Sequence, residues 1–106
     1  MTVSTHILDT CRGRPAADVR VRLELHDDGW RTIAEGRTDD DGRVRDLGPE
    51  TLAPGVYRLV FATGAYLGPD AFFPEVTLTF RISDGTAHHH VPLLLSPFAY
   101  STYRGS

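Results

Sequence analysis

Residues 90–106 read HVPLLLSPFAYSTYRGS, and this stretch decides the fold that we predict for the chain. It begins with an apolar strand, turns at Ser96-Pro97, and continues as a second strand rich in aromatic and hydroxyl side chains. It closes on Tyr103-Arg104-Gly105-Ser106. The end of a chain usually frays unless other parts of the molecule hold it. An arginine among tyrosine, glycine and serine therefore indicates a segment inserted into a site, with the rest of the chain as its scaffold.

The composition limits both the size and the chemistry of the protein. A chain of 106 residues with a net charge of -3 predicts one domain, residues 1–106, without nucleic acid or an anionic membrane surface as a partner. All eleven basic residues are arginines, which excludes lysine Schiff-base chemistry. The single cysteine, Cys11, excludes an internal disulfide and a multi-cysteine zinc site. The first ten residues have no charged leader and no long apolar run, so we expect a cytoplasmic protein without a signal peptide.

The alternation of apolar and polar residues predicts about eight short β-strands. We expect these strands over residues 3–10, 19–26, 30–38, 43–47, 56–63, 74–82, 88–95 and 98–103. One short helix is expected within residues 64–73, where Gly68 and Pro69 limit its length. Short strands with a turn about every ten residues are typical of a β-sandwich, so the predicted fold class is all-β.

The faces of the strands separate core residues from candidate functional residues, because side chains two apart share a face. Val91, Leu93 and Leu95 form an apolar face and should point into the core. His88 and His90 then lie on the opposite, outer face. His6 likewise lies opposite its core neighbour in residues 3–10. This outer face mixes histidine, tyrosine and leucine, which indicates an interface or a ligand site, and we expect another subunit to cover it.

Each candidate residue also has a structural interpretation. A histidine on a strand is usually a surface or hydrogen-bonded residue, Arg43 could be a solvated turn residue, and Tyr103 could pack in an interface. The run His88-His89-His90 could indicate a metal, but no carboxylate or cysteine completes a ligand pattern, so we predict no metal site. The acidic turn DDDG (residues 39–42) lacks the spacing of a calcium loop and is predicted to be a plain turn.

Several segments together resemble one known family. These are STHILDT with GRPA, the turn DGR, FPEVTLTF, HHVPLLLSPFAYSTY and, most specifically, the final YRGS. They are similar to the 5-hydroxyisourate hydrolases, the transthyretin-like enzymes of purine degradation, over essentially the whole chain. The resemblance implies a transthyretin-like β-sandwich of two four-stranded sheets. It also implies a homotetramer with its sites in a channel between dimers.

The resemblance also assigns roles to residues. It implies that His6, Arg43, His90 and Ser106 are catalytic, and that His6, Arg43, Tyr103, Arg104 and Gly105 bind the substrate. The family opens the six-membered ring of 5-hydroxyisourate to give 2-oxo-4-hydroxy-4-carboxy-5-ureidoimidazoline, and no cofactor is implied. His6 and His90 are both candidates for the general base. Whether the tail serves its own subunit or a neighbour stays open.

Two other functions fit the same fold, because a fold does not decide a function. The first alternative is a transthyretin-like carrier that binds a small ligand in the channel. The second is an interaction module without a small ligand. A carrier has no need of two histidines, an arginine and the YRGS segment on one face, so the hydrolase is the preferred prediction.

Overall fold

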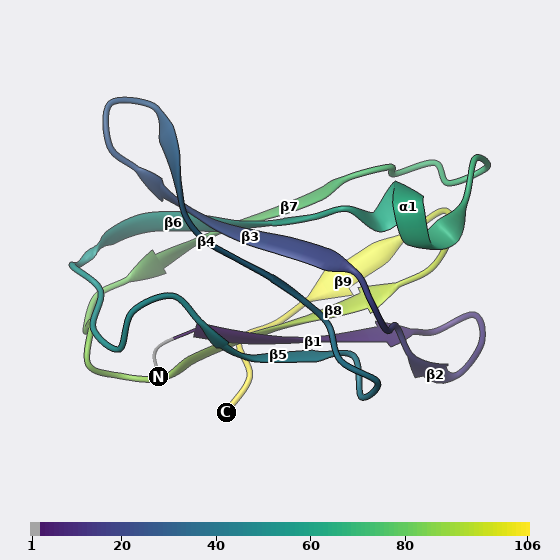
Figure 1. The fold of residues 1–106 in the computed structure, drawn as a ribbon, viewed down its shortest axis with the longest axis horizontal. Coiled ribbons are helices and arrows are strands. Elements are labelled where there is room, and N and C mark those ends of the chain that lie inside the picture. Colours follow the sequence, from purple (N-terminus) through teal and green to yellow (C-terminus); the bar gives the residue numbers. More distant parts are fainter. Residues whose placement is uncertain (1–2) are drawn as a thin grey trace.

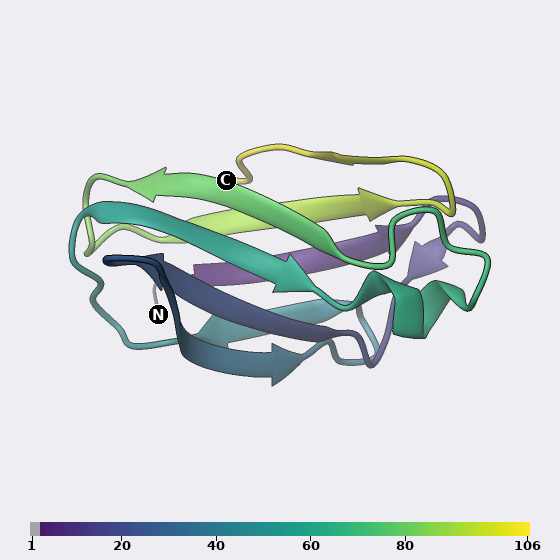
Figure 2. The same ribbon diagram turned by 90° about the horizontal axis from the view of Figure 1, so that it is seen from above.

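The computed structural model describes residues 3–106 and has the predicted all-β architecture, with two sheets packed face to face (Figure 1). Its strands are β1 (Val3–Asp9), β2 (Arg14–Pro15), β3 (Arg20–His26), β4 (Trp30–Arg37), β5 (Arg43–Leu47), β6 (Gly55–Phe61), β7 (Val76–Ile82), β8 (His89–Leu95) and β9 (Tyr100–Thr102). One short helix, α1 (Thr63–Leu67), follows β6. Figure 2 shows the strands of both sheets lying roughly along the same axis, with neighbouring arrows pointing in opposite directions in most pairs, and α1 at one end of the sandwich.

The first sheet has the order β2-β1-β8-β9, and β5 also pairs with β1. Strand β8 runs parallel to β1 and occupies one edge of it over its whole length. Strands β2 and β5 therefore share the other edge of β1, so this five-stranded sheet is only four strands wide. The second sheet has the order β4-β3-β6-β7. The predicted pair of four-stranded sheets is thus confirmed in outline, with the two-residue β2 added to the first.

The core lies between the sheets and is built by the predicted alternation. Ile7, Leu59, Phe61, Leu93 and Leu95 are fully buried. Burying an aliphatic or aromatic side chain contributes about 1.5–3 kcal/mol, so this layer is the main source of stability. Because the side chains of Leu93 and Leu95 point inward, the alternate residues of β8 point outward. The functional face of β8 therefore lies on the outside of the sandwich.

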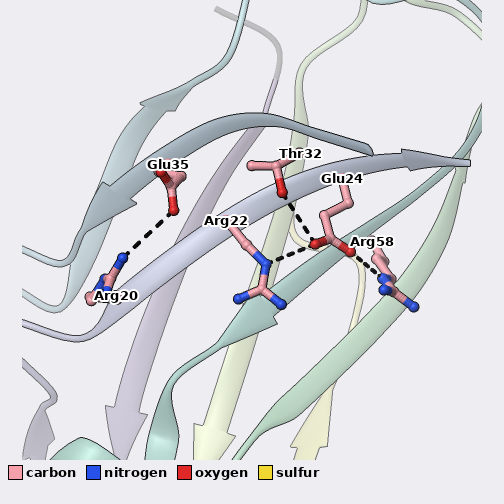
Figure 3. A network of polar contacts seen from close by, with 6 residues as sticks. All are labelled: Arg20, Arg22, Glu24, Thr32, Glu35 and Arg58. Carbon is pink, nitrogen blue, oxygen red and sulfur yellow. Dashed lines mark hydrogen bonds and ion pairs between the residues drawn. The ribbon is translucent and has the colours of Figure 1, made fainter. Parts of the chain in front are cut away.

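The outer face of the second sheet holds a buried carboxylate. Glu24 alternates with the apolar core residues of β3, yet it is only 5% exposed. Figure 3 shows its carboxylate between two guanidinium groups: Nε of Arg22 donates to it at 2.7 Å, and Nε of Arg58 donates at 2.5 Å. The hydroxyl of Thr32 lies 3.3 Å away. A buried carboxylate needs such partners, and the Arg22 hydrogen bond is the main reason that the pKa of Glu24 is lowered.

The remaining differences concern the ends of elements. Strand β9 has three residues where six were predicted, and the pairing of β3 with β4 contains one register shift, between Leu23 and Glu24. Among residues 3–106, no helix is long and apolar enough to cross a membrane.

Candidate active site

A cleft of about 530 Å³ opens on the outer face of the first sheet. Its walls come from β1, β5, the start of β8 and the end of the chain. Figure 1 shows the end of the chain on the side of this sheet that faces away from the other sheet. The lining residues are Ser4, Thr5, His6, Arg43, Val44, Arg45, His88, His90, Tyr103, Gly105 and Ser106. All the residues predicted to be catalytic are therefore in one place.

A tight turn before β5 positions Arg43. The carboxylate of Asp39 accepts hydrogen bonds from the backbone N–H groups of Asp41 (2.9 Å) and Arg43 (3.0 Å). Gly42 adopts a φ of +74°, and a Cβ at this position would collide with the carbonyl of Ile7. The turn therefore requires glycine, and it delivers Arg43 to a register position directly opposite His6 on β1.

The parallel pairing of β1 and β8 brings the two histidines to the same face. Ser4 lies opposite His90, and His6 lies opposite Pro92. His6 and His90 are thus diagonal neighbours on adjacent strands, a spacing of roughly 7–8 Å between backbones that long side chains can bridge. Both side chains are half-buried.

Ser4 holds the ring of His90. Its hydroxyl oxygen lies 2.8 Å from Nδ1 of His90 and 2.9 Å from Nε2 of His88. The rings of His88 and His90 are nearly parallel, with centroids 6.4 Å apart. Because Nδ1 of His90 is engaged by Ser4, the nitrogen of His90 that remains for a ligand in the cleft is Nε2.

The last residues of the chain form the other wall of the cleft. The backbone N–H of Gly105 donates to the carbonyl of His90 at 2.8 Å, so the tail of this chain reaches the cleft of the same chain. A Cβ on Gly105 would collide with the ring of His90. Glycine is therefore the residue that lets the tail close over the imidazole, with Tyr103 and Ser106 on either side of it.

One predicted site residue lies elsewhere. Arg104 does not line this cleft but a second pocket of about 340 Å³, between β7 and the last residues of the chain. His89 lines that second pocket as well, and its Nδ1–H donates to the carbonyl of Ala87 at 3.0 Å. His89 is buried on the core side of β8, away from the cleft, as the alternation of faces predicted.

The electrostatics of the cleft favour a neutral His90. Burial lowers the pKa of His90 below its ordinary value of 6.5, and the positive charge of Arg43, then His88 and His6, lower it further. A protonated ring beside a fixed guanidinium is disfavoured, so His90 keeps a free lone pair near neutral pH. The cleft thus combines a proton acceptor with a cation suited to a carbonyl oxygen or an oxyanion.

Five of the lining residues were missed by the sequence analysis. Among these five, Ser4 lies within hydrogen-bond distance of His90, and His88 lies within hydrogen-bond distance of Ser4. The signal was available for Ser4, because it shares a strand face with His6. Within residues 3–106, no group of three or more histidine, cysteine, aspartate or glutamate side chains is arranged to hold a metal ion.

Comparisons with known proteins agree with this geometry. A family model described as the HIUase/Transthyretin family matches residues 3–105. A 5-hydroxyisourate hydrolase of Salmonella typhimurium is 51% identical over 109 residues, which cover 98% of this chain and 80% of that protein. The structure of a Klebsiella pneumoniae 5-hydroxyisourate hydrolase matches with a TM-score of 0.89 and 38% identity over 100% of both chains. A sea bream transthyretin in complex with thyroxine matches with a TM-score of 0.91 and 35% identity, over 99% of this chain and 95% of that one.

Proposed function

Because this chain belongs to the HIUase/Transthyretin family, we propose that it hydrolyses 5-hydroxyisourate to 2-oxo-4-hydroxy-4-carboxy-5-ureidoimidazoline in uric acid degradation. The observation that carries the proposal is the meeting of His6, Arg43 and His90 in one cleft beside the last residues of the chain. Residues 1–106 act as one hydrolase domain in this proposal.

The reaction requires three catalytic functions from the protein. Water must lose a proton, the oxygen of the attacked carbonyl must be stabilised as it gains negative charge, and the leaving nitrogen must receive a proton. In our proposal, neutral His90 accepts the proton of water at Nε2, with His6 as its partner on the same face. Arg43 donates hydrogen bonds to the developing oxyanion, for which a planar guanidinium is well suited.

The tail completes the site. Tyr103 stacks on or hydrogen-bonds to the planar substrate ring, and Ser106 adds a hydroxyl to the reacting group. Gly105 closes the backbone over His90, as its hydrogen bond to the His90 carbonyl supports. Arg104 lines the neighbouring pocket and not this cleft, so in our proposal its side chain takes no part in binding the substrate.

The carrier function is not favoured. The sea bream transthyretin shows that this fold can hold thyroxine, but the cleft of this chain presents two arginines and three histidines. Pockets that bind small apolar ligands are lined mainly by hydrophobic and aromatic side chains. A cleft lined by titratable and cationic groups is better suited to a polar, planar substrate and to proton transfer.

Assembly and location are further parts of the proposal. Leu8 and Leu94 are register partners on the outer face of the first sheet, and both are only half-buried in the single chain. We propose a cytoplasmic homotetramer in which this face meets another subunit, as the resemblance implies. Light scattering that gives the molar mass of a monomer at working concentrations would contradict the tetramer.

The decisive experiment supplies freshly made 5-hydroxyisourate and follows its ultraviolet absorbance with and without protein. The control is spontaneous decay. We expect the wild type to accelerate the decay, and His90→Ala to lower kcat by about 10²–10⁴-fold, the usual contribution of a general base. A His90→Ala variant with near wild-type kcat would refute the assignment of the base. A wild type without acceleration would refute the function.

A further inference from the structure

A histidine outside the predicted catalytic set is joined to His90 through one hydroxyl group. Ser4 is 7% exposed, and its oxygen lies within hydrogen-bond distance of Nδ1 of His90 and Nε2 of His88. His90 is half-buried in the cleft, whereas His88 is exposed. The three side chains therefore form a line from half-buried His90, through Ser4, to His88, which is exposed in the single chain.

The hydroxyl of Ser4 determines which atom is the donor in each of its two hydrogen bonds to the histidines. A serine has one proton to donate, so when Ser4 donates to one histidine, it can only accept from the other. In one arrangement, Nδ1–H of His90 donates to Ser4, and Ser4 donates to Nε2 of His88. In the other, every hydrogen bond is reversed. The tautomers of the two histidines are therefore linked, and only the first arrangement leaves a lone pair on Nε2 of His90.

We infer that Ser4 and His88 are positioning residues that form a proton relay with His90, which holds the water-derived proton between the two halves of the reaction. The inference rests on the proposed hydrolysis of 5-hydroxyisourate.

The relay takes up one proton from water and later gives one proton to the leaving nitrogen, so it ends in the state in which it began. As water attacks, its proton moves to Nε2 of His90. The Nδ1 proton of His90 passes to the oxygen of Ser4, and the hydroxyl proton of Ser4 passes to Nε2 of His88. The positive charge is then on His88, and His90 is neutral with its proton on Nε2. When the C–N bond breaks, His90 gives this proton to the leaving nitrogen, and the relay runs back to its starting state.

Electrostatics supplies the reason for the transfer. The charged and titratable groups that face His90 are His6 on β1, Arg43 on β5 and His88, with Tyr103 on the tail lining the same cleft. A cationic His90 would be held in a half-buried place beside the guanidinium of Arg43. Because His88 is the more exposed of the two rings in the single chain, the positive charge costs less hydration free energy on His88 than on half-buried His90.

The test separates proton transfer from mere support. His88→Gln places an amide oxygen near the position of Nε2, so it can accept the hydrogen bond of Ser4 but cannot take up a proton. We expect kcat to fall roughly 10- to 100-fold, the size of loss that follows when the hydrogen-bond partner of a metal-binding histidine is removed. The KM should be unchanged, and added imidazole should restore kcat, because free imidazole can take the proton from Ser4. The control is His26→Gln, an exposed histidine on the other sheet, which should keep wild-type kcat.

A double variant provides the second readout. Ser4→Ala and His88→Gln interrupt the same relay, so the double variant should be no slower than the slower single variant, and Ser4→Thr should keep most of the activity. His88→Gln with full kcat, a loss that imidazole does not restore, or additive losses would each overturn the relay while the wild type stays active. A wild type inactive on 5-hydroxyisourate would instead remove the proposed function and the relay together.

Discussion

Arg43 places a fixed positive charge beside a titrating imidazole, and this arrangement has a measurable consequence. Burial and then Arg43 are the two largest causes of the lowered pKa of His90. Arg43→Gln removes one of them, so the pKa of His90 should rise and the acidic limb of the kcat/KM profile should move to higher pH. The position of that limb in a pH–rate profile on 5-hydroxyisourate is the measurement, and nuclear magnetic resonance titration of the His90 ring is its check.

Arg43→Lys is the matched control for this prediction. Lysine keeps the charge but loses the planar pair of donors, so kcat/KM should fall while the acidic limb stays where the wild type has it. If Arg43→Gln left the acidic limb in place, the charge of Arg43 would not be acting on the base.

The lowered pKa of His90 also sets the sign of its contribution to stability. The unfolded chain binds a proton to this residue below the ordinary pKa of 6.5, and the folded chain resists doing so. The contribution of His90 to the free energy of unfolding is therefore fully present above pH 6.5, and it is lost as the pH falls toward the folded pKa. The same property that suits His90 for accepting a proton makes the fold less stable in acid.

At the residue scale, simple alternation predicted much of the site. It placed His6 and His90 outside and Leu93 inside, and all three are where it put them. Alternation could not predict Ser4 as the partner of His90, because that contact depends on which strands are neighbours. Nor could it predict a buried Glu24, which depends on arginines from its own strand and from β6.

At the scale of elements, the position of Arg43 depends on the turn of residues 39–42, and this turn is held by the carboxylate of Asp39. Asp39→Ala removes the acceptor for the backbone N–H groups of Asp41 and Arg43. We expect kcat/KM to fall by up to about 10²-fold, the effect of a displacement of roughly 1 Å at an active site. Steady-state kinetics measure this fall, and circular dichroism should show an unchanged fold.

Asp40→Ala is the control for this turn, because it removes a carboxylate from the same four residues without removing that acceptor. Asp39→Asn keeps a carbonyl oxygen at the same position and should lose less activity than Asp39→Ala. Equal activity in Asp39→Ala and the wild type would mean that the strand pairing of β5 with β1 positions Arg43 without the turn.

The pairing of strands limits what the sequence could predict at this scale. The existence of β1, β5 and β8 followed from their patterns, but their neighbours did not. The parallel pairing of β1 with β8 joins residues more than eighty positions apart, and it is this pairing that sets Ser4 against His90. The tail likewise meets its own cleft through one backbone hydrogen bond, from Gly105 to His90, which no periodicity encodes.

At the scale of the whole molecule, a side-chain hydrogen bond links α1, which follows β6 of the second sheet, to β1 of the first sheet. The hydroxyl of Tyr66 on α1 donates to the carboxylate of Asp9 on β1 at 2.7 Å. Asp9 is 2% exposed and also accepts from the backbone N–H groups of Cys11 and Arg12. Burial alone would raise the pKa of Asp9, but the Tyr66 hydroxyl, these two N–H groups and the charge of Arg12 outweigh it, so the pKa is lowered.

Tyr66→Phe should therefore destabilise the sandwich in a pH-dependent way. Leaving a buried carboxylate oxygen without its donor costs about 1–3 kcal/mol of unfolding free energy. The loss should be largest where Asp9 is charged, and it should shrink as the pH falls through the folded pKa of Asp9, which lies below the ordinary aspartate value of 3.8. Urea unfolding at a series of pH values measures the difference. The control is Tyr100→Phe, which removes the hydroxyl of an exposed tyrosine. A loss that stays constant down to strongly acidic pH would show that the ring of Tyr66, rather than its bond to charged Asp9, joins the two layers.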